Sequence, residues 1–123
     1  MTKITRILTV DDSASMRALL NHALTASGFA VEQADDGVAA LEWLAVNEVD
    51  VVITDINMPR LDGFGLIEKL RAGTRHCDRP ILVLTTESSD EKKARARSAG
   101  ATGWIMKPFD PEKLVAAVRR VSQ

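Results

Sequence analysis

The chain has 123 residues, of which 46% are hydrophobic and 27% are charged, and its formal net charge is −1. This length predicts one domain, residues 1–123, that is large enough to bury a core of its own. The near-neutral charge argues against a nucleic-acid-binding surface, and no apolar run approaches the roughly 20 residues of a membrane span. A single cysteine, Cys77, excludes an internal disulfide framework and fits a reducing, cytoplasmic compartment.

Short apolar runs alternate along the chain with segments of helical periodicity. In chain order the pattern predicts a strand at 6–10, a helix at 16–27, a strand at 29–34, a helix at 38–45, a strand at 49–54, a helix at 63–72, a strand at 81–85, a helix within 88–100, a strand at 103–106 and a helix at 111–121. Ser88 and Glu91 have the spacing of a capping box, which predicts Ser88 as the N-cap of the fourth helix.

Five strands that alternate with five helices predict βαβ units and an α/β fold. Right-handed crossovers place helices on both faces of a five-stranded parallel sheet, which gives a doubly wound, three-layer sandwich. The runs at 49–54 and 81–85 are almost continuously apolar, so we expect these strands inside the sheet rather than at its edges. Ligand sites in such folds form beyond the carboxyl ends of the strands.

Charged and hydroxyl side chains stand where four of the predicted strands end. They are Asp11 and Asp12 after the first strand, Asp55 after the third, Thr85 at the end of the fourth and Lys107 after the fifth. An aspartate in such a place is commonly a turn former or a helix N-cap. Three converging carboxylates, however, need a cation between them, and ligand sets made only of oxygen suit Mg²⁺. A carboxylate can also accept a phosphoryl group, whose oxygens a metal ion, a hydroxyl and an ammonium would neutralise.

The motifs at these positions resemble those of the response-regulator receiver domains. The matching segments are Val10-Asp11-Asp12-Ser13, Asp55-Ile56-Asn57-Met58-Pro59 with Asp62-Gly63, Thr85-Thr86-Glu87, and Lys107-Pro108-Phe109. The resemblance covers essentially the whole chain and is closest to the single-domain chemotaxis regulators of the CheY type. It implies a flavodoxin-like (βα)5 fold with strand order 2-1-3-4-5.

Carried over by position, the resemblance implies phosphoacceptor chemistry. Asp55 would accept the phosphoryl group, while Thr85 and Lys107 would hold its oxygens. The implied Mg²⁺ ligands are oxygens at the same edge of the sheet: Asp12, Asp55, the main-chain carbonyl of Asn57 and, through a bound water, Asp11. The Lys107–Pro108 peptide bond would be cis, as in the family.

The resemblance also assigns a switch and a partner face. Thr85 and Trp104 occupy the switch positions, although the family usually has Tyr or Phe in place of this tryptophan. An indole is larger and carries an N–H that needs a partner when buried, so the extent of its movement is left open. Thr86 stands where many relatives have a smaller residue, which would narrow access to the phosphoryl group. The expected partner face comprises Lys93 and Arg97 on a fourth helix with a poor apolar stripe, together with Trp104 and Met106 on the fifth strand.

The resemblance implies a monomeric phosphoacceptor module of a two-component system. A CheA-like histidine kinase would phosphorylate it and a flagellar motor switch protein would be its target. A phosphate sink or another stand-alone receiver is the alternative. Such a protein would be no enzyme beyond catalysing its own phosphorylation and dephosphorylation, and it would bind no nucleic acid and insert into no membrane.

Two other classes of protein compete with this interpretation. A small phosphohydrolase of the haloacid-dehalogenase type would need a second aspartate two residues after the nucleophile, where this chain has Asn57. A flavin-binding domain of the flavodoxin type would need a Ser/Thr/Gly phosphate loop after the first strand, and none follows it. His22 and His76 have no partners at metal-ligand spacing, and we expect both at the surface.

Overall fold

The computed structural model describes residues 4–122, so residues 1–3 and 123 of the expected domain lie outside the described part. Its elements are β1 (Arg6–Val10), α1 (Ala14–Thr25), β2 (Ala30–Ala34), α2 (Gly37–Leu44), β3 (Val51–Thr54), α3 (Gly63–Ala72), β4 (Ile81–Thr85), α4 (Asp90–Ala99), β5 (Gly103–Met106) and α5 (Pro111–Val121). The predicted alternation is confirmed, with most ends shifted by no more than two residues. In the described part, no helix combines the length and apolar character needed to cross a membrane.

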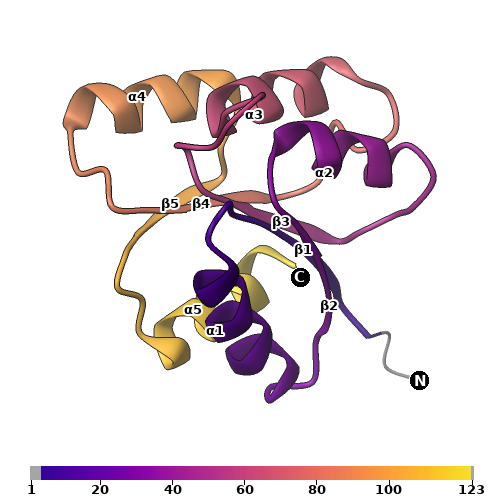
Figure 1. Cartoon of the computed structure of the whole chain (residues 1–123), viewed down its shortest axis with the longest axis vertical. Helices are drawn as coiled ribbons and strands as arrows, with labels where there is room; N and C mark the ends of the chain where they lie inside the picture. The colour runs from indigo at the N-terminus through magenta and orange to yellow at the C-terminus, as the bar shows by residue number, and fades with distance from the viewer. Residues whose placement is uncertain (1–3, 123) are drawn as a thin grey trace.

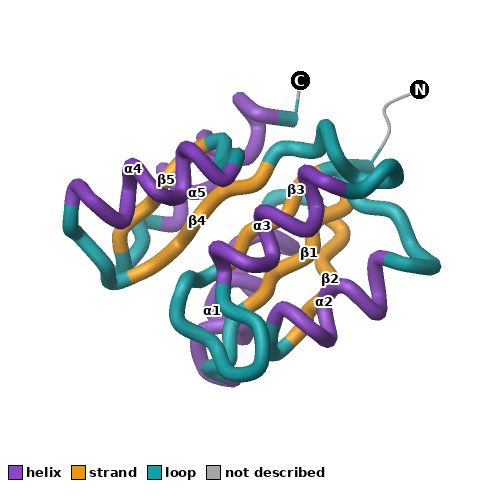
Figure 2. Tube along the Cα trace, turned by 90° about the horizontal axis from the view of Figure 1, so that it is seen from above, coloured by secondary structure: helices purple, strands orange, loops and turns teal. Residues whose placement is uncertain are grey.

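All five strands form one parallel sheet in the order β2-β1-β3-β4-β5, as predicted. Helices α2, α3 and α4 cover one face and α1 and α5 the other (Figure 1). On the first face α3 lies between α2 and α4 (Figure 2). Every residue of β3 and β4 is buried, which confirms that these apolar runs lie inside the sheet.

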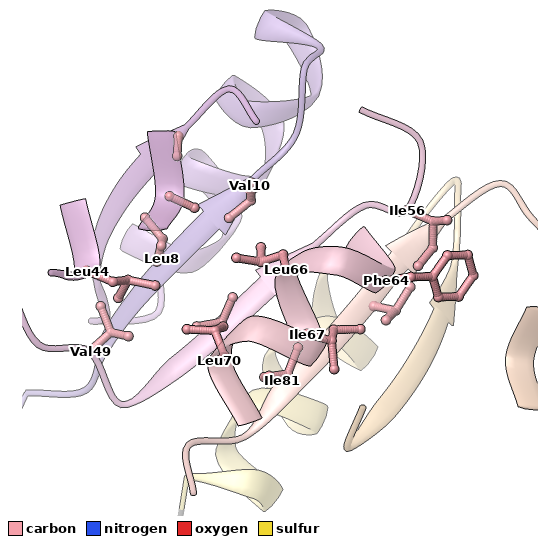
Figure 3. Close-up of a cluster of buried hydrophobic side chains, with 14 of the residues drawn as sticks. Leu8, Val10, Leu44, Val49, Ile56, Phe64, Leu66, Ile67, Leu70 and Ile81 are labelled. Atoms are coloured by element: carbon pink, nitrogen blue, oxygen red, sulfur yellow. The ribbon is translucent and has the colours of Figure 1, made fainter. Parts of the chain in front are cut away.

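The sheet separates two hydrophobic clusters, because successive side chains of a strand point to opposite faces. In β3, Val52 packs into the cluster beneath α2, α3 and α4, while Ile53 packs into the cluster over α1 and α5. Figure 3 shows the first cluster, in which Leu66 and Ile67 of α3 lie against the sheet. Val49 also fills this cluster, although it precedes β3 and does not join the ladder as predicted. The two clusters pack against opposite faces of the strands and so fix the positions of their carboxyl ends.

Helix α4 is anchored weakly, as its poor apolar stripe predicted. Ala96 is its only buried residue, and the guanidinium of Arg95 lies 4.0 Å from the ring centre of Phe64 on α3. Its N-cap is Ser89, whose hydroxyl accepts a hydrogen bond from the main-chain N–H of Lys92 at 3.1 Å. The prediction of Ser88 was therefore wrong by one residue, because the helix begins at Asp90. An element with so little buried surface is easily displaced.

The loop between α3 and β4 corrects a second expectation. Cys77 is exposed there, but His76 is only 4% exposed and lies against the ends of α2 and α3. Burial, together with the charges of Arg75 and Arg79, lowers the pKa of the His76 imidazole below its ordinary value of 6.5. This burial could not be predicted from the local sequence, because it depends on how the loop lies beside the two helices.

We expect His76 to make the free energy of unfolding depend on pH. The unfolded chain protonates His76 near pH 6.5, while the folded chain does so only at lower pH. The free energy of unfolding is therefore unaffected by His76 above pH 6.5, and it decreases as the pH falls below 6.5 because protons bind preferentially to the unfolded chain. Between pH 7.5 and 5.5 the free energy of unfolding should therefore fall more in the wild type than in a variant without this imidazole. Urea unfolding of His76→Gln should lack this component. The exposed His22→Gln is the matched control, and an unchanged slope in His76→Gln would contradict the assignment.

Candidate functional site

The predicted site residues lie together at the carboxyl edge of the sheet. Carboxylate oxygens of Asp11, Asp12 and Asp55 all lie within 4.8 Å of one another. Asp11 is 2% exposed and Asp55 is 9% exposed, whereas Asp12 is an exposed residue. The acid cluster, meaning these three aspartates, therefore has a buried floor and one side open to solvent.

Lys107 holds the two buried carboxylates together. Its Nζ donates hydrogen bonds to Oδ2 of Asp11 and to Oδ2 of Asp55, each at 2.7 Å. Its main-chain N–H bonds to the carbonyl of Thr85 at 2.9 Å, and the Lys107–Pro108 bond is cis, as expected. Burial alone would lower the pKa of Lys107, but the hydrogen bonds to the two carboxylates outweigh burial and raise it. Three carboxylates and one ammonium leave a net charge of −2, which one divalent cation would balance.

Main-chain N–H groups fix the remaining oxygens of the buried carboxylates. The N–H of Ile56 donates to Oδ1 of Asp55 at 2.6 Å, and the N–H of Ser13 donates to Oδ1 of Asp11 at 2.9 Å. Each buried carboxylate thus has one oxygen on the backbone and the other on Lys107. These hydrogen bonds orient both carboxylates without any ligand.

A polar chain crosses from the β3–α3 loop to α4 beside the acid cluster. The side-chain amide of Asn57 donates to Oε1 of Glu87 at 3.2 Å, and the ammonium of Lys92 pairs with the same oxygen at 3.0 Å. The Lys92 and Asn57 contacts hold the pKa of Glu87 below its usual value. The hydroxyl of the fully buried Thr85 accepts from the N–H of Glu87 at 3.3 Å. Glu87 stood in a recognised motif, but sequence reasoning gave it no role.

The β3–α3 loop contains a second pair that the sequence did not predict. Arg60 has a positive φ of 66°, which costs a residue with a side chain about 1 kcal/mol. Its guanidinium donates to both carboxylate oxygens of Asp36, at 2.6 and 2.9 Å. This pair lowers the pKa of Asp36. Asp36 as an N-cap is readable from its place before a helix, but the partner and the backbone of Arg60 are not.

The predicted partner face lies along α4 and β5. Lys93, Arg97 and Trp104 line a common pocket of about 90 Å³, and Met106 is 37% exposed. Trp104 is half-buried against the cluster beneath α2, α3 and α4. Its indole N–H is buried and has no acceptor among residues 4–122, an arrangement that costs about 1–3 kcal/mol.

Known proteins share the sequence pattern and the fold of this chain. The family model described as "Response regulator receiver domain" matches residues 7–119. The chain belongs to the response regulator receiver domains. Membership in this family favours a phosphoacceptor over a phosphohydrolase or a flavin-binding domain.

Curated relatives and solved structures agree with this receiver assignment. Response regulator MprA of Mycobacterium sp. (strain KMS) is 43% identical over 114 residues, which cover 93% of this chain and 49% of the relative. The receiver chain thus spans about half the length of the MprA relatives. Chemotaxis protein CheY4 of Vibrio cholerae has a TM-score of 0.92 at 43% identity, covering 97% of this chain and 99% of that one. A response regulator from Chloroflexus aurantiacus has a TM-score of 0.93 at 32% identity, covering 98% of both chains.

Proposed function

We propose that this receiver domain accepts a phosphoryl group on Asp55 from a histidine kinase, with Mg²⁺ bound at the acid cluster. The observation that carries the proposal is the sharing of the Lys107 ammonium by Asp55 and Asp11, beside the open side at Asp12. A carboxylate held in this way is oriented for attack, and the lysine is in place to receive the charge of a transferred group.

The residues present fit Mg²⁺. The donors are all oxygen, the net charge of −2 suits a divalent cation, and the open side leaves room for water and phosphate. Asp12, Asp55 and the main-chain carbonyl of Asn57 would bind the ion directly, and Asp11 through a water. When bound, Mg²⁺ supplies neutralisation of the negative charge that gathers on the phosphoryl oxygens.

The side chains of the site account for the transfer step. A carboxylate oxygen of Asp55 attacks phosphorus, the bond from phosphorus to the donor nitrogen breaks, and its electron pair stays on the donor imidazole, which takes up a proton from solvent. The ammonium of Lys107 then bonds to a phosphoryl oxygen instead of Oδ2 of Asp55. The Thr85 hydroxyl accepts from the N–H of Glu87, so its own proton is free for a second phosphoryl oxygen.

Phosphorylation with a small phosphodonor tests the proposal. Incubation with the donor and Mg²⁺ should add one phosphoryl group, detected as a mass increase of the intact protein. Asp55→Asn should abolish this increase because an amide is not a competent nucleophile. Asp78→Asn, in the exposed loop between α3 and β4, is the matched control and should be labelled normally. Labelling of Asp55→Asn at the wild-type level would remove Asp55 from its role.

The α4–β5 face is the surface through which we propose that phosphorylation is read. One support is the weak anchoring of α4. The other is the buried indole N–H of Trp104, which can gain a hydrogen-bond acceptor only if the ring changes position or a partner protein supplies one. When Thr85 moves toward the phosphoryl group, Trp104 would fill the vacated space, and Lys93 and Arg97 beside it would meet the partner. The chemotaxis name of CheY4 supports a CheA-like kinase and a flagellar motor switch protein as partners of a cytoplasmic monomer.

The phosphorylated sample also separates the output roles. Phosphorylation-dependent binding to a motor switch protein, absent in Asp55→Asn, would support a chemotaxis regulator. Phosphorylation without any change in affinity for that protein would favour a phosphate sink or another stand-alone receiver. The MprA relatives, which are named response regulators without reference to chemotaxis, keep this second candidate in view.

A further inference from the structure

The β3–α3 loop is held from outside by an ion pair that no packing requirement explains. Arg60 is the only residue other than glycine with a positive φ among residues 4–122. Its side chain is 55% exposed, so the core does not impose this conformation. The fork of its guanidinium nevertheless grips both oxygens of Asp36, whose side chain is 6% exposed. Strain of this kind persists where the surroundings hold a residue in place, and it gathers at functional sites.

Capping of α2 does not require Arg60. Asp36 already serves as the N-cap through its own contact with the N–H of Ala39 at 2.8 Å. The adjacent Gly37 donates its N–H to the carbonyl of Leu61 at 3.2 Å, and a Cβ on Gly37 would lie 2.6 Å from that oxygen. The start of α2 is therefore in backbone contact with the β3–α3 loop. It provides a fixed surface to which Arg60 can anchor the β3–α3 loop.

The anchored loop is the one that leads from Asp55 through Asn57. Asn57 precedes Arg60 by three residues and is tied on its other side to Glu87 at 3.2 Å. Three of the four residues from 57 to 60 are exposed, and only Met58 is partly buried against the core. The loop is thus attached to Glu87 on one side and to Asp36 and Gly37 on the other, and between these contacts only Met58 and Leu61 pack partly against the core.

We propose that Arg60 is a positioning residue for the metal site, resting on the function proposed above. Its ion pair with Asp36 holds the β3–α3 loop in place. The main-chain carbonyl of Asn57 is thereby kept beside the acid cluster, where it can bind the same cation. Ordering this loop in advance removes an entropic cost from metal binding. Residues that orient metal ligands from behind typically change metal affinity by about 10- to 100-fold when they are replaced.

Residue-resolved NMR titration of Mg²⁺ into the full chain tests this role. Arg60→Ala should weaken Mg²⁺ binding by about tenfold. Electrostatics alone predicts the opposite sign, because removing a cation and freeing Asp36 makes the region more negative. Amide relaxation in the absence of metal should show increased motion at residues 57–61. Arg120→Ala, an exposed arginine near the far end of α5, is the matched control and should bind Mg²⁺ normally.

Glycine at position 60 separates positioning from stability. Arg60→Gly relieves the positive φ, so it should be at least as stable as Arg60→Ala, yet its looser backbone should bind Mg²⁺ no better. Asp36→Asn, which keeps a good N-cap residue, should weaken Mg²⁺ binding similarly, and the double variant Asp36→Asn/Arg60→Ala should add little. The proposal would be overturned if Arg60→Ala bound Mg²⁺ as tightly as the wild type or more tightly. It would also be overturned if the Mg²⁺ affinities of these variants rose and fell with their free energies of unfolding.

A further variant distinguishes failure of this proposal from failure of the function beneath it. Asp12→Ala should lose Mg²⁺ binding if the acid cluster is the metal site. Wild-type Mg²⁺ affinity in Arg60→Ala, together with loss of Mg²⁺ binding in Asp12→Ala, refutes only the positioning role of Arg60. Unchanged binding in Asp12→Ala refutes the metal site, and with it the positioning role of Arg60.

Discussion

Replacing Lys107 by alanine is expected to lower the free energy of unfolding of the metal-free protein by about 3 kcal/mol. The Lys107 side chain is 10% exposed, and its ammonium bonds to two carboxylates that are themselves almost wholly buried. Removing one partner of a buried ion pair leaves the other charge uncompensated, and here two charges lose their partner at once. The destabilisation is thus an electrostatic effect of the acid cluster rather than a loss of packing.

Mg²⁺ should reverse much of this loss. Without the ammonium the acid cluster carries −3 rather than −2, so Lys107→Ala should bind the ion more tightly than the wild type. Ligand binding to the folded state stabilises it in proportion to RT ln(1 + [Mg²⁺]/Kd). Urea unfolding with and without Mg²⁺ measures both effects. Lys113→Ala, an exposed lysine on α5, should show neither.

The same variant tests whether Lys107 transmits phosphorylation. Asp55 keeps its nucleophilic carboxylate, so Lys107→Ala should still be labelled by a small phosphodonor. Phosphorylation should, however, leave the affinity of this variant for a target unchanged, because no ammonium is present to bond to the phosphoryl group. Normal stability together with normal phosphorylation-dependent binding would show that the lysine is dispensable.

The residues that could be predicted are those whose position the parallel sheet determines. Asp11, Asp55 and Lys107 each follow a strand, and the carboxyl ends of parallel strands meet at one edge of the sheet. Their convergence therefore followed from the apolar runs before any contact was known. The weak anchoring of α4 was equally readable, because an amphipathic pattern either is present in a helix or is missing.

The features that escaped prediction depend on contacts between loops. The positive φ of Arg60 occurs together with an ion pair to Asp36, 24 residues earlier in the chain, and arginine has no preference for that conformation. His76 is buried beside the ends of α2 and α3, to which no local pattern connects it. Glu87 was visible in a motif, but its bridge between Asn57 and Lys92 exists only once the loops have folded. Such contacts modulate a site whose main groups the sheet positions.

Asp12→Ala is expected to abolish Mg²⁺ binding and phosphorylation together. Asp11 and Asp55 have both oxygens occupied by Lys107 and the backbone, so the exposed Asp12 is the carboxylate most available to an incoming ion. Without it the cluster has a net charge of −1, which no longer matches a divalent cation. The affinity for Mg²⁺ should fall by about 100-fold or more, as expected when a direct ligand is lost rather than a supporting residue.

Stability should change in the opposite direction, which makes this prediction specific. Asp12 lies within 4.8 Å of two other carboxylates and repels both, so its removal should stabilise the metal-free protein by about 1 kcal/mol. Urea unfolding without metal measures this gain, and NMR titration measures the loss of Mg²⁺ binding. Asp90→Ala, an exposed carboxylate at the start of α4, should leave Mg²⁺ affinity unchanged. A variant that binds no metal because it is unfolded would be less stable, whereas loss of a repelling ligand predicts a protein that is more stable and does not bind.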